Sequence, residues 1–241
     1  MGRNNNTTLT NPATRFFEWS AVDGTIRYFD KELGERGENV NVDLPFKFLV
    51  LERVAQVTGG VDRNGGYEGF WSNAVMNLKT QKLVVRSKQG IEVSGLYEDI
   101  KNHPGIRYMQ GLYIAYYEGQ QLQIGFLKIK GAALSSWIEF TKKHRNIFEG
   151  AFSVTGSTKQ KKGSNTYLAP TFEFIPKVSD ASEVVAKTLA AQVEEYMETY
   201  LAQGAISEVE REYTGVVSYD DHEPAMGPWN PTDDDAPEEV F

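Results

Sequence analysis

Residues 106–131, IRYMQGLYIAYYEGQQLQIGFLKIKG, carry the clearest strand pattern of the chain. Both halves of this stretch are rich in β-branched and aromatic residues, and they meet at Gly119, which is typical of two strands joined by a short turn. The sequence therefore predicts an antiparallel hairpin in the middle of the chain.

Side chains of a strand alternate between two faces, and this alternation divides the hairpin into a core side and a second side. Leu127 and Ile129 share the face that we expect in the core. Aromatic and basic side chains share the other faces: Phe126, Lys128 and Lys130 in the second strand, and Arg107 and Tyr113 in the first. The second strand thus presents a strip of one ring and two ammonium groups.

Upstream of this hairpin, the strand patterns begin at Phe16. Asp23-Gly24 is a strong turn pair and predicts a first hairpin, and residues 44–57 predict one long strand. The five glycines of residues 59–69 then predict a loop. Rings on such a segment are harder to bury, so we expect the aromatic side chains there at the surface: Tyr67, Phe70 and Trp71.

Downstream of the hairpin, residues 132–144 have helical spacing, with Trp137 expected in the core. Residues 151–175 predict a further hairpin, whose tip carries three bases: Lys159, Lys161 and Lys162. Short, glycine-punctuated strands with few helices predict a mainly β fold of the α+β class. An OB-like five-stranded barrel with an intervening helix fits this order, and so do other β-rich folds.

Residues 180–203 predict a long C-terminal helix. Asp180 and Glu183 form a capping-box pattern, and Gly204 is a helix terminator. An apolar stripe runs along the helix through Val185, Leu189, Val193, Tyr196 and Tyr200. The stripe either packs on the barrel of the same chain or mediates self-association.

The charge distribution divides the chain into a body and a tail. The formal net charge is -8, but residues 212–241 hold nine acids and no Lys or Arg, so residues 1–211 carry 25 bases and 24 acids, a net +1. We expect a flexible N-terminus over residues 1–14, an OB-like domain over residues 15–212, and a disordered acidic tail over residues 213–241.

Composition and motifs exclude several classes of protein. Cysteine is absent, which leaves no disulfides and no thiolate metal ligands. No apolar run approaches the ~20 residues of a membrane span, and the N-terminus lacks the apolar core of a secretory signal, so an intracellular, cytoplasmic location is expected. The sequence has no phosphate-binding glycine loop, no nucleophile elbow and no clustered histidines. We therefore expect neither an enzyme nor a metal or other cofactor.

Rings beside cations indicate a surface for single-stranded nucleic acid. Every base offers a π face, so stacking needs no sequence readout and contributes roughly 1–3 kcal/mol per base, while Lys and Arg follow the phosphates. The candidate DNA-binding residues are Tyr67, Phe70, Trp71, Arg107, Tyr113, Phe126, Lys128, Lys130, Lys159, Lys161 and Lys162. The alternative interpretation of each ring is that it belongs to the core.

The last residues of the chain, DDDAPEEVF (233–241), resemble the C-termini of single-stranded DNA-binding proteins of bacteria and bacteriophages. Bacterial members typically end in D-D-D-I-P-F, and phage members end in acids and Phe. This chain differs by the inserted APEE and by Val240 in place of Pro. The stretch LKIKGAALSSWIEF (127–140) also resembles phage-encoded proteins of this type.

The resemblance implies an OB-fold body and a partner-recruiting tail. The tail would compete with DNA for the basic groove, at an effective concentration of up to mM for a short flexible linker. Once released, it would dock on a replication or recombination protein through Asp233, Asp234, Asp235, Glu238, Glu239 and Phe241.

The sequence thus predicts a phage-encoded, non-enzymatic, sequence-independent single-stranded DNA-binding protein of replication, recombination or repair, acting in the host cytoplasm. Two alternatives stay open: a replisome or assembly adaptor without DNA affinity, and a metal-dependent nuclease. The sequence leaves the oligomeric state and any RNA binding undetermined.

Two deletions in the tail should separate its effect on DNA affinity from its effect on partner binding. Deleting residues 214–241 should tighten binding to single-stranded DNA, most at low salt, because a tethered polyanion is removed. Deleting Phe241 alone keeps every acid and should leave DNA affinity unchanged, while it abolishes capture of replication or recombination proteins in pull-downs. Weaker DNA binding by the truncated chain would contradict the competition.

Overall fold

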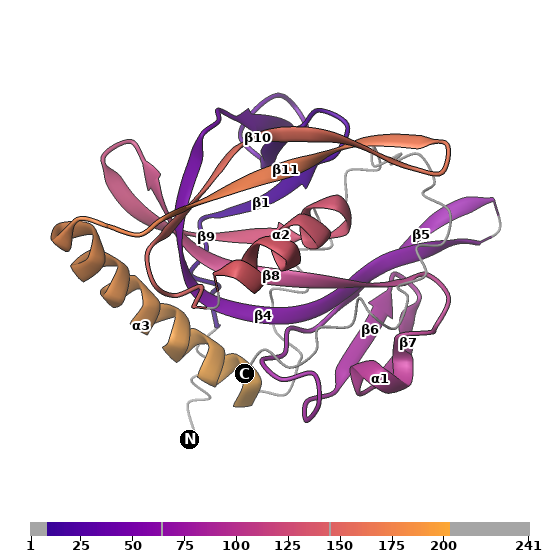
Figure 1. Cartoon of the computed structure of the whole chain (residues 1–241). Helices are drawn as coiled ribbons and strands as arrows, with labels where there is room; N and C mark the ends of the chain where they lie inside the picture. Colours follow the sequence, from indigo (N-terminus) through magenta and orange to yellow (C-terminus); the bar gives the residue numbers. More distant parts are fainter. Residues whose placement is uncertain (1–8, 64, 145, 203–241) are drawn as a thin grey trace, which may run out of the picture.

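The computed structural model describes residues 9–63, 65–144 and 146–202 (Figure 1). In chain order the elements are β1 (Arg15–Ser20), β2 (Thr25–Asp30), β3 (Glu38–Val42), β4 (Phe46–Arg63), β5 (Gly66–Ser72), β6 (Leu83–Ser87), β7 (Gly90–Gly95), α1 (Tyr97–Ile100), β8 (Ile106–Glu118), β9 (Gln121–Ile129), α2 (Gly131–Lys143), β10 (Ala151–Lys162), β11 (Asn165–Ile175) and α3 (Asp180–Ala202). The prediction of a mainly β fold with a long C-terminal helix is confirmed.

The 18-residue strand β4 organises the sheet. It pairs with β8 along most of its length, with β10 near its start and with β5 near its end. All eleven strands of the described residues join one sheet, in the order β3-β2-β1-β9-β8-β4-β5-β6-β7, with β10 on β4 and β11 on β10. Figure 1 shows this sheet curving around α2.

The sheet is open and does not form the five-stranded barrel that the sequence pattern predicts. Residues 59–69 are not a loop, because β4 continues through them to Arg63 and the chain returns as β5 from Gly66. Strand β6 pairs with β5, and β7 pairs with β6, so these strands extend the sheet at one end. At the other end β1 pairs in parallel with β9 and adds β2 and β3.

The main core lies between the curved sheet and α2. Trp137 of α2 is 1% exposed, and its ring centroid lies 5.2 Å from that of Phe152 and 5.1 Å from that of Phe172. Leu127 and Ile129 of β9 belong to the same cluster. The predicted core positions of Trp137, Leu127 and Ile129 are confirmed.

Helix α3 packs on the other side of the sheet, across β4, β8 and β9 (Figure 1). Its buried residues are Ser182, Ala186, Val193, Tyr196, Met197 and Tyr200. The predicted stripe therefore packs on the sheet of the same chain, except that Val185 at its start is exposed. No helix in the described part of the chain, α3 included, has the length and apolar character needed to cross a membrane.

The start of α3 differs from the predicted capping box. Ser179 is the capping residue, since its Oγ accepts a hydrogen bond from the backbone N–H of Ser182 at 3.2 Å. The carboxylate of Glu183 instead pairs with Lys187 one turn along the helix, at 2.7 Å. A serine one position earlier satisfies the same need for an acceptor at the helix N-terminus.

Gly59 tests whether the backbone of β4 needs glycine. Its φ is +127°, and a Cβ there would clash with the carbonyl oxygen of Gly105. Gly59→Ala should therefore lower the free energy of unfolding by roughly 2–4 kcal/mol in a denaturant titration. Gly66→Ala, at an unstrained position in the same hairpin with open space around it, should change it by less than about 0.5 kcal/mol. Equal effects would contradict the close approach to Gly105.

Candidate nucleic-acid interface

The candidate interface is the outer face, which we define as the side of β4, β5, β8 and β9 on which α3 lies. Thr58 of β4 is paired with Trp71 of β5 on one side and with Arg107 of β8 on the other. Directly paired residues of antiparallel strands point to the same face. The outer face therefore carries Thr58, Trp71 and Arg107 in one row.

The β4–β5 hairpin extends this row toward its tip. Tyr67 is paired with Asp62 and shares the face of Trp71, four residues further along β5. The side chain of Tyr67 is 56% exposed, and Trp71 is partly exposed. The prediction of surface rings on this segment is confirmed for these two residues.

Phe70 lies on the opposite face of β5 and belongs to the core. It is 3% exposed and packs with Val57, Leu83 and Val85. The prediction of a surface ring is wrong here, because β5 is a strand and its alternation points Phe70 away from Tyr67 and Trp71. Strand alternation with a period of two, applied to residues 66–72, would have placed Tyr67 and Trp71 on one face and Phe70 on the other.

Phe126 and Tyr113 are on the outer face but are not exposed. They are 4% and 3% exposed, and their ring centroids lie 4.9 Å apart in an edge-to-face arrangement. Tyr196 of α3 covers them, with its ring centroid 6.1 Å from that of Tyr113. The expectation that Phe126 and Tyr113 lie on an accessible surface is wrong, because α3 covers that part of the face.

A carboxylate lies among the cations of the face. Glu18 of β1 bonds Arg27 at 2.8 Å (Oε1 to Nη2) and pairs with Lys130 at 3.5 Å (Oε2 to Nζ). Lys128 is its neighbour in the parallel β1–β9 pairing. Burial alone would raise the pKa of Glu18, but Lys130, Lys128 and Arg27 lower it to about 2. One negative charge therefore forms ion pairs with Arg27 and Lys130, attracts Lys128, and leaves the group a net positive charge.

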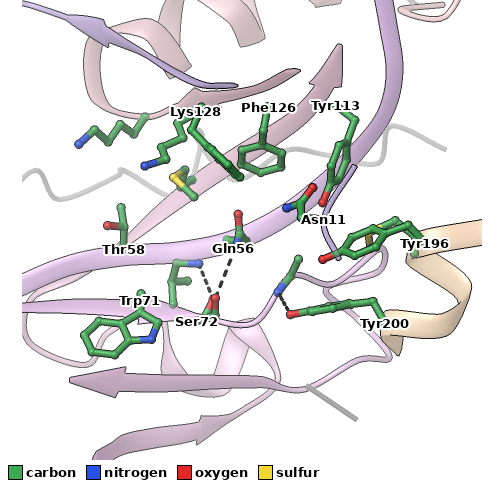
Figure 2. Close-up of a pocket in the computed structure, with 16 residues that line it drawn as sticks. Asn11, Gln56, Thr58, Trp71, Ser72, Tyr113, Phe126, Lys128, Tyr196 and Tyr200 are labelled. Atoms are coloured by element: carbon green, nitrogen blue, oxygen red, sulfur yellow. Dashed lines mark hydrogen bonds between the residues drawn. The ribbon is translucent and has the colours of Figure 1, made fainter. Parts of the chain in front are cut away.

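A pocket lies where the covered and open parts of the outer face meet (Figure 2). Five predicted residues line it together: Trp71, Tyr113, Phe126, Lys128 and Lys130. Its cavity volume is about 80 Å³. This is well below the roughly 300–1,000 Å³ of sites that enclose a whole ligand, so the pocket can hold only part of a larger molecule.

Other residues line this pocket that were not predicted as site residues, among them Gln56, Ser72, Tyr196 and Tyr200. The sequence predicts Tyr196 and Tyr200 only as members of the apolar stripe of the C-terminal helix. Figure 2 shows both rings reaching from α3 toward the pocket, with the Tyr200 hydroxyl accepting a hydrogen bond from the backbone N–H of Ala74 at 3.0 Å. The helical spacing predicted that these rings share one apolar face of the helix. The sequence did not show which surface that face packs against.

The remaining predicted residues lie elsewhere. Lys159, Lys161 and Lys162 are exposed at the end of the β10–β11 hairpin, away from the pocket lining. The tail residues 233–241 lie outside the described residues. Within residues 9–63, 65–144 and 146–202, no group of three or more acidic or histidine side chains is placed to hold a metal ion.

Comparison of the chain with protein-family models, with curated proteins and with solved structures gave no match.

Glu18 provides a test of the electrostatics of the face. Its folded-state pKa of about 2 lies below the ordinary 4.5, so its ion pairs stabilise the fold above pH 4.5 and this contribution disappears as the pH falls toward 2. Glu18→Gln should cost roughly 2–3 kcal/mol of unfolding free energy at neutral pH, measured by denaturant titration, and progressively less below pH 4.5. Glu173→Gln, at an exposed acid of β11, should show little effect. A pH-independent difference would contradict the ion-pair explanation.

Proposed function

We propose that the protein binds single-stranded DNA across the outer face, without reading an extended sequence. The observation that carries the proposal is the row on this face, where the accessible rings of Tyr67 and Trp71 share a surface with Arg107 and, further along, with Lys128. Rings of this kind stack with bases at roughly 1–3 kcal/mol each, and cations beside them follow the phosphates. The arrangement combines the two interactions that single-strand binding requires.

The connectivity of five strands supports an OB-like interpretation. Strands β4, β8 and β9 form a meander, α2 follows, and the β10–β11 hairpin returns so that β10 pairs with β4. This order resembles that of an OB fold, although the eleven-stranded sheet is open. Among the described residues, β1 occupies the position beside β9 where the fifth strand would close such a barrel, and β11 meets the β1–β2 turn through Leu168 N–H to Ala21 O, at 2.8 Å.

The exposed and partly exposed predicted residues are consistent with the way an OB fold binds oligonucleotides. Such folds use the face of their second and third strands, together with the loops between strands one and two and between strands four and five. On this assignment β8 and β9 provide Arg107 and Lys128, and the first loop contains β5 with Tyr67 and Trp71. The last loop is the β10–β11 tip, which carries Lys159, Lys161 and Lys162.

The charges of the face account for binding without sequence selectivity. Phosphate contacts release counterions from the strand, so affinity should fall by about 0.7 log units per log unit of salt for each contact. Glu18 offsets one of the three positive charges around it, which keeps Lys128 and Lys130 positioned without cancelling the net attraction. We further infer that the acidic tail and Phe241 recruit a replication or recombination protein of a phage-infected host cell, as the resemblance of the tail implies.

A titration of a fluorescently labelled dT oligonucleotide, with and without Mg²⁺, tests the proposal. Binding that weakens with salt and greatly exceeds binding to duplex DNA is expected. An absence of binding would favour an adaptor protein, and Mg²⁺-dependent degradation of the oligonucleotide would favour a nuclease.

Two ring substitutions locate the site. Trp71→Ala and Tyr67→Ala should each weaken dT binding about tenfold, because each removes a stacking surface. Phe148→Ala removes another exposed ring outside the outer face and serves as the matched control, for which unchanged affinity is expected. Circular dichroism should show all three variants folded. Wild-type affinity in both Trp71→Ala and Tyr67→Ala would place the site elsewhere.

A further inference from the structure

Two polar atoms at the pocket are buried without a hydrogen-bond partner among the described residues. They are Oε1 of Gln56, an acceptor, and Nε1 of Trp71, a donor. The amide nitrogen of Gln56 is used, since it donates to the carbonyl oxygen of Ser72 at 3.3 Å. Buried polar atoms are nearly always paired, and leaving one unpaired costs roughly 1–3 kcal/mol. One unpaired donor and one unpaired acceptor at the same pocket indicate a ligand that supplies the complementary pair.

The walls of the pocket favour a flat, apolar ligand body. Phe126 and Tyr113 form one wall, and Tyr196 and Tyr200, stacked with ring centroids 5.9 Å apart, form another (Figure 2). Aromatic walls of this kind accept a planar ring. The ligand that fits is therefore flat and carries both a hydrogen-bond donor and an acceptor.

Cations lie at one rim of the same pocket. Figure 2 shows the Lys128 side chain projecting from β9 next to Phe126, and Lys130 also lines the pocket. A ring inserted into the pocket could thus remain attached to a phosphate at the lysine rim. This is the chemistry of a nucleotide unit within a strand.

We propose that the pocket takes one pyrimidine base of the bound strand, a proposal that rests on the proposed function. Gln56 Oε1 accepts from the base N–H (N3–H of thymine or N4–H of cytosine), and Trp71 Nε1 donates to an acceptor atom of the same nucleotide. The cavity of about 80 Å³ selects the smaller, single-ring base. Phosphates on either side of this base contact Lys128 and Lys130.

The pocket can adapt to admit the base. Both polar atoms are covered in the ligand-free protein, and Met109 and Met197 are part of the lining. Methionine is unbranched and changes rotamer at small cost. A rotamer change of these two side chains is a way for the lining to make room for the base without a movement of the sheet.

The experiment compares a dT oligonucleotide with one of the same length built from N3-methylthymidine. Methylation removes the N3–H donor and blocks that edge, but leaves the π face available for stacking. The wild-type protein should bind the methylated strand about tenfold more weakly, the scale of a lost base-edge contact. In Gln56→Leu, which has no acceptor at this position, the two strands should bind within about twofold of each other.

Gln123→Leu provides the matched control. Gln123 lies on β9 outside the pocket lining, so this variant should keep the tenfold difference between the strands. A second, affinity-independent measurement is the ¹H–¹⁵N signal of the Trp71 indole, assigned by its loss in Trp71→Phe. This signal should move downfield on addition of dT oligonucleotide as Nε1–H gains an acceptor, and should move less with the methylated strand.

The outcomes separate this inference from the proposed function. Equal binding of the two strands by the wild-type protein, with salt-sensitive affinity retained, overturns the base pocket and leaves single-strand binding intact. A tenfold difference that persists in Gln56→Leu also overturns the pocket as assigned. Failure to bind either strand overturns the proposed function and this inference with it.

Discussion

The backbone hydrogen bonding of β4 is the constraint on which the rest of the structure depends. A strand has two edges, and the edges of β4 are occupied by β8 over most of its length, by β10 near its start and by β5 near its end. To serve all three partners, β4 has to bend: its register with β8 shifts between Val50 and Glu52, and Gly59 and Gly60 adopt positive φ angles. As a result, the first part of β4 packs against the α2 core, and its last part continues into the β4–β5 hairpin.

The central strands β8 and β9 are buried on both faces, and this divides the candidate interface in two. Leu112, Leu127 and Ile129 face the α2 core, while Tyr113 and Phe126 face α3. Where α3 covers the outer face, the rings stabilise the fold through packing. Where α3 does not reach, the β4–β5 hairpin keeps Tyr67 exposed and Trp71 partly exposed beside Arg107. The pocket lies at the boundary between the covered and the open part of the outer face. Two polar atoms of its lining residues, Gln56 Oε1 and Trp71 Nε1, have no hydrogen-bond partner within the described part of the chain.

The electrostatics of the face follow the same division. Glu18 is held ionised by the cations around it, and it links β1 to β2 through Arg27 and to the start of α2 through Lys130. The lysines of the β10–β11 tip, by contrast, are exposed and project into solvent. A polyanion would thus meet a group of cations around Glu18 near the pocket and a second, solvent-exposed group at the hairpin tip.

By itself the sequence determined the elements that depend on local pattern: the hairpin of residues 106–131, the core positions of Leu127, Ile129 and Trp137, and the helix beginning at Asp180. Alternation along β5 also separates Phe70 from Tyr67 and Trp71, although the glycines suggested a loop instead. Only the tertiary structure decided which face α3 covers, so only it could show that Tyr113 and Phe126 are enclosed and that Gln56, Tyr196 and Tyr200 join them at one pocket. The physical reason is that periodicity specifies which side chains share a face, whereas burial of that face depends on contacts between residues more than 50 positions apart, such as Tyr113 and Tyr196.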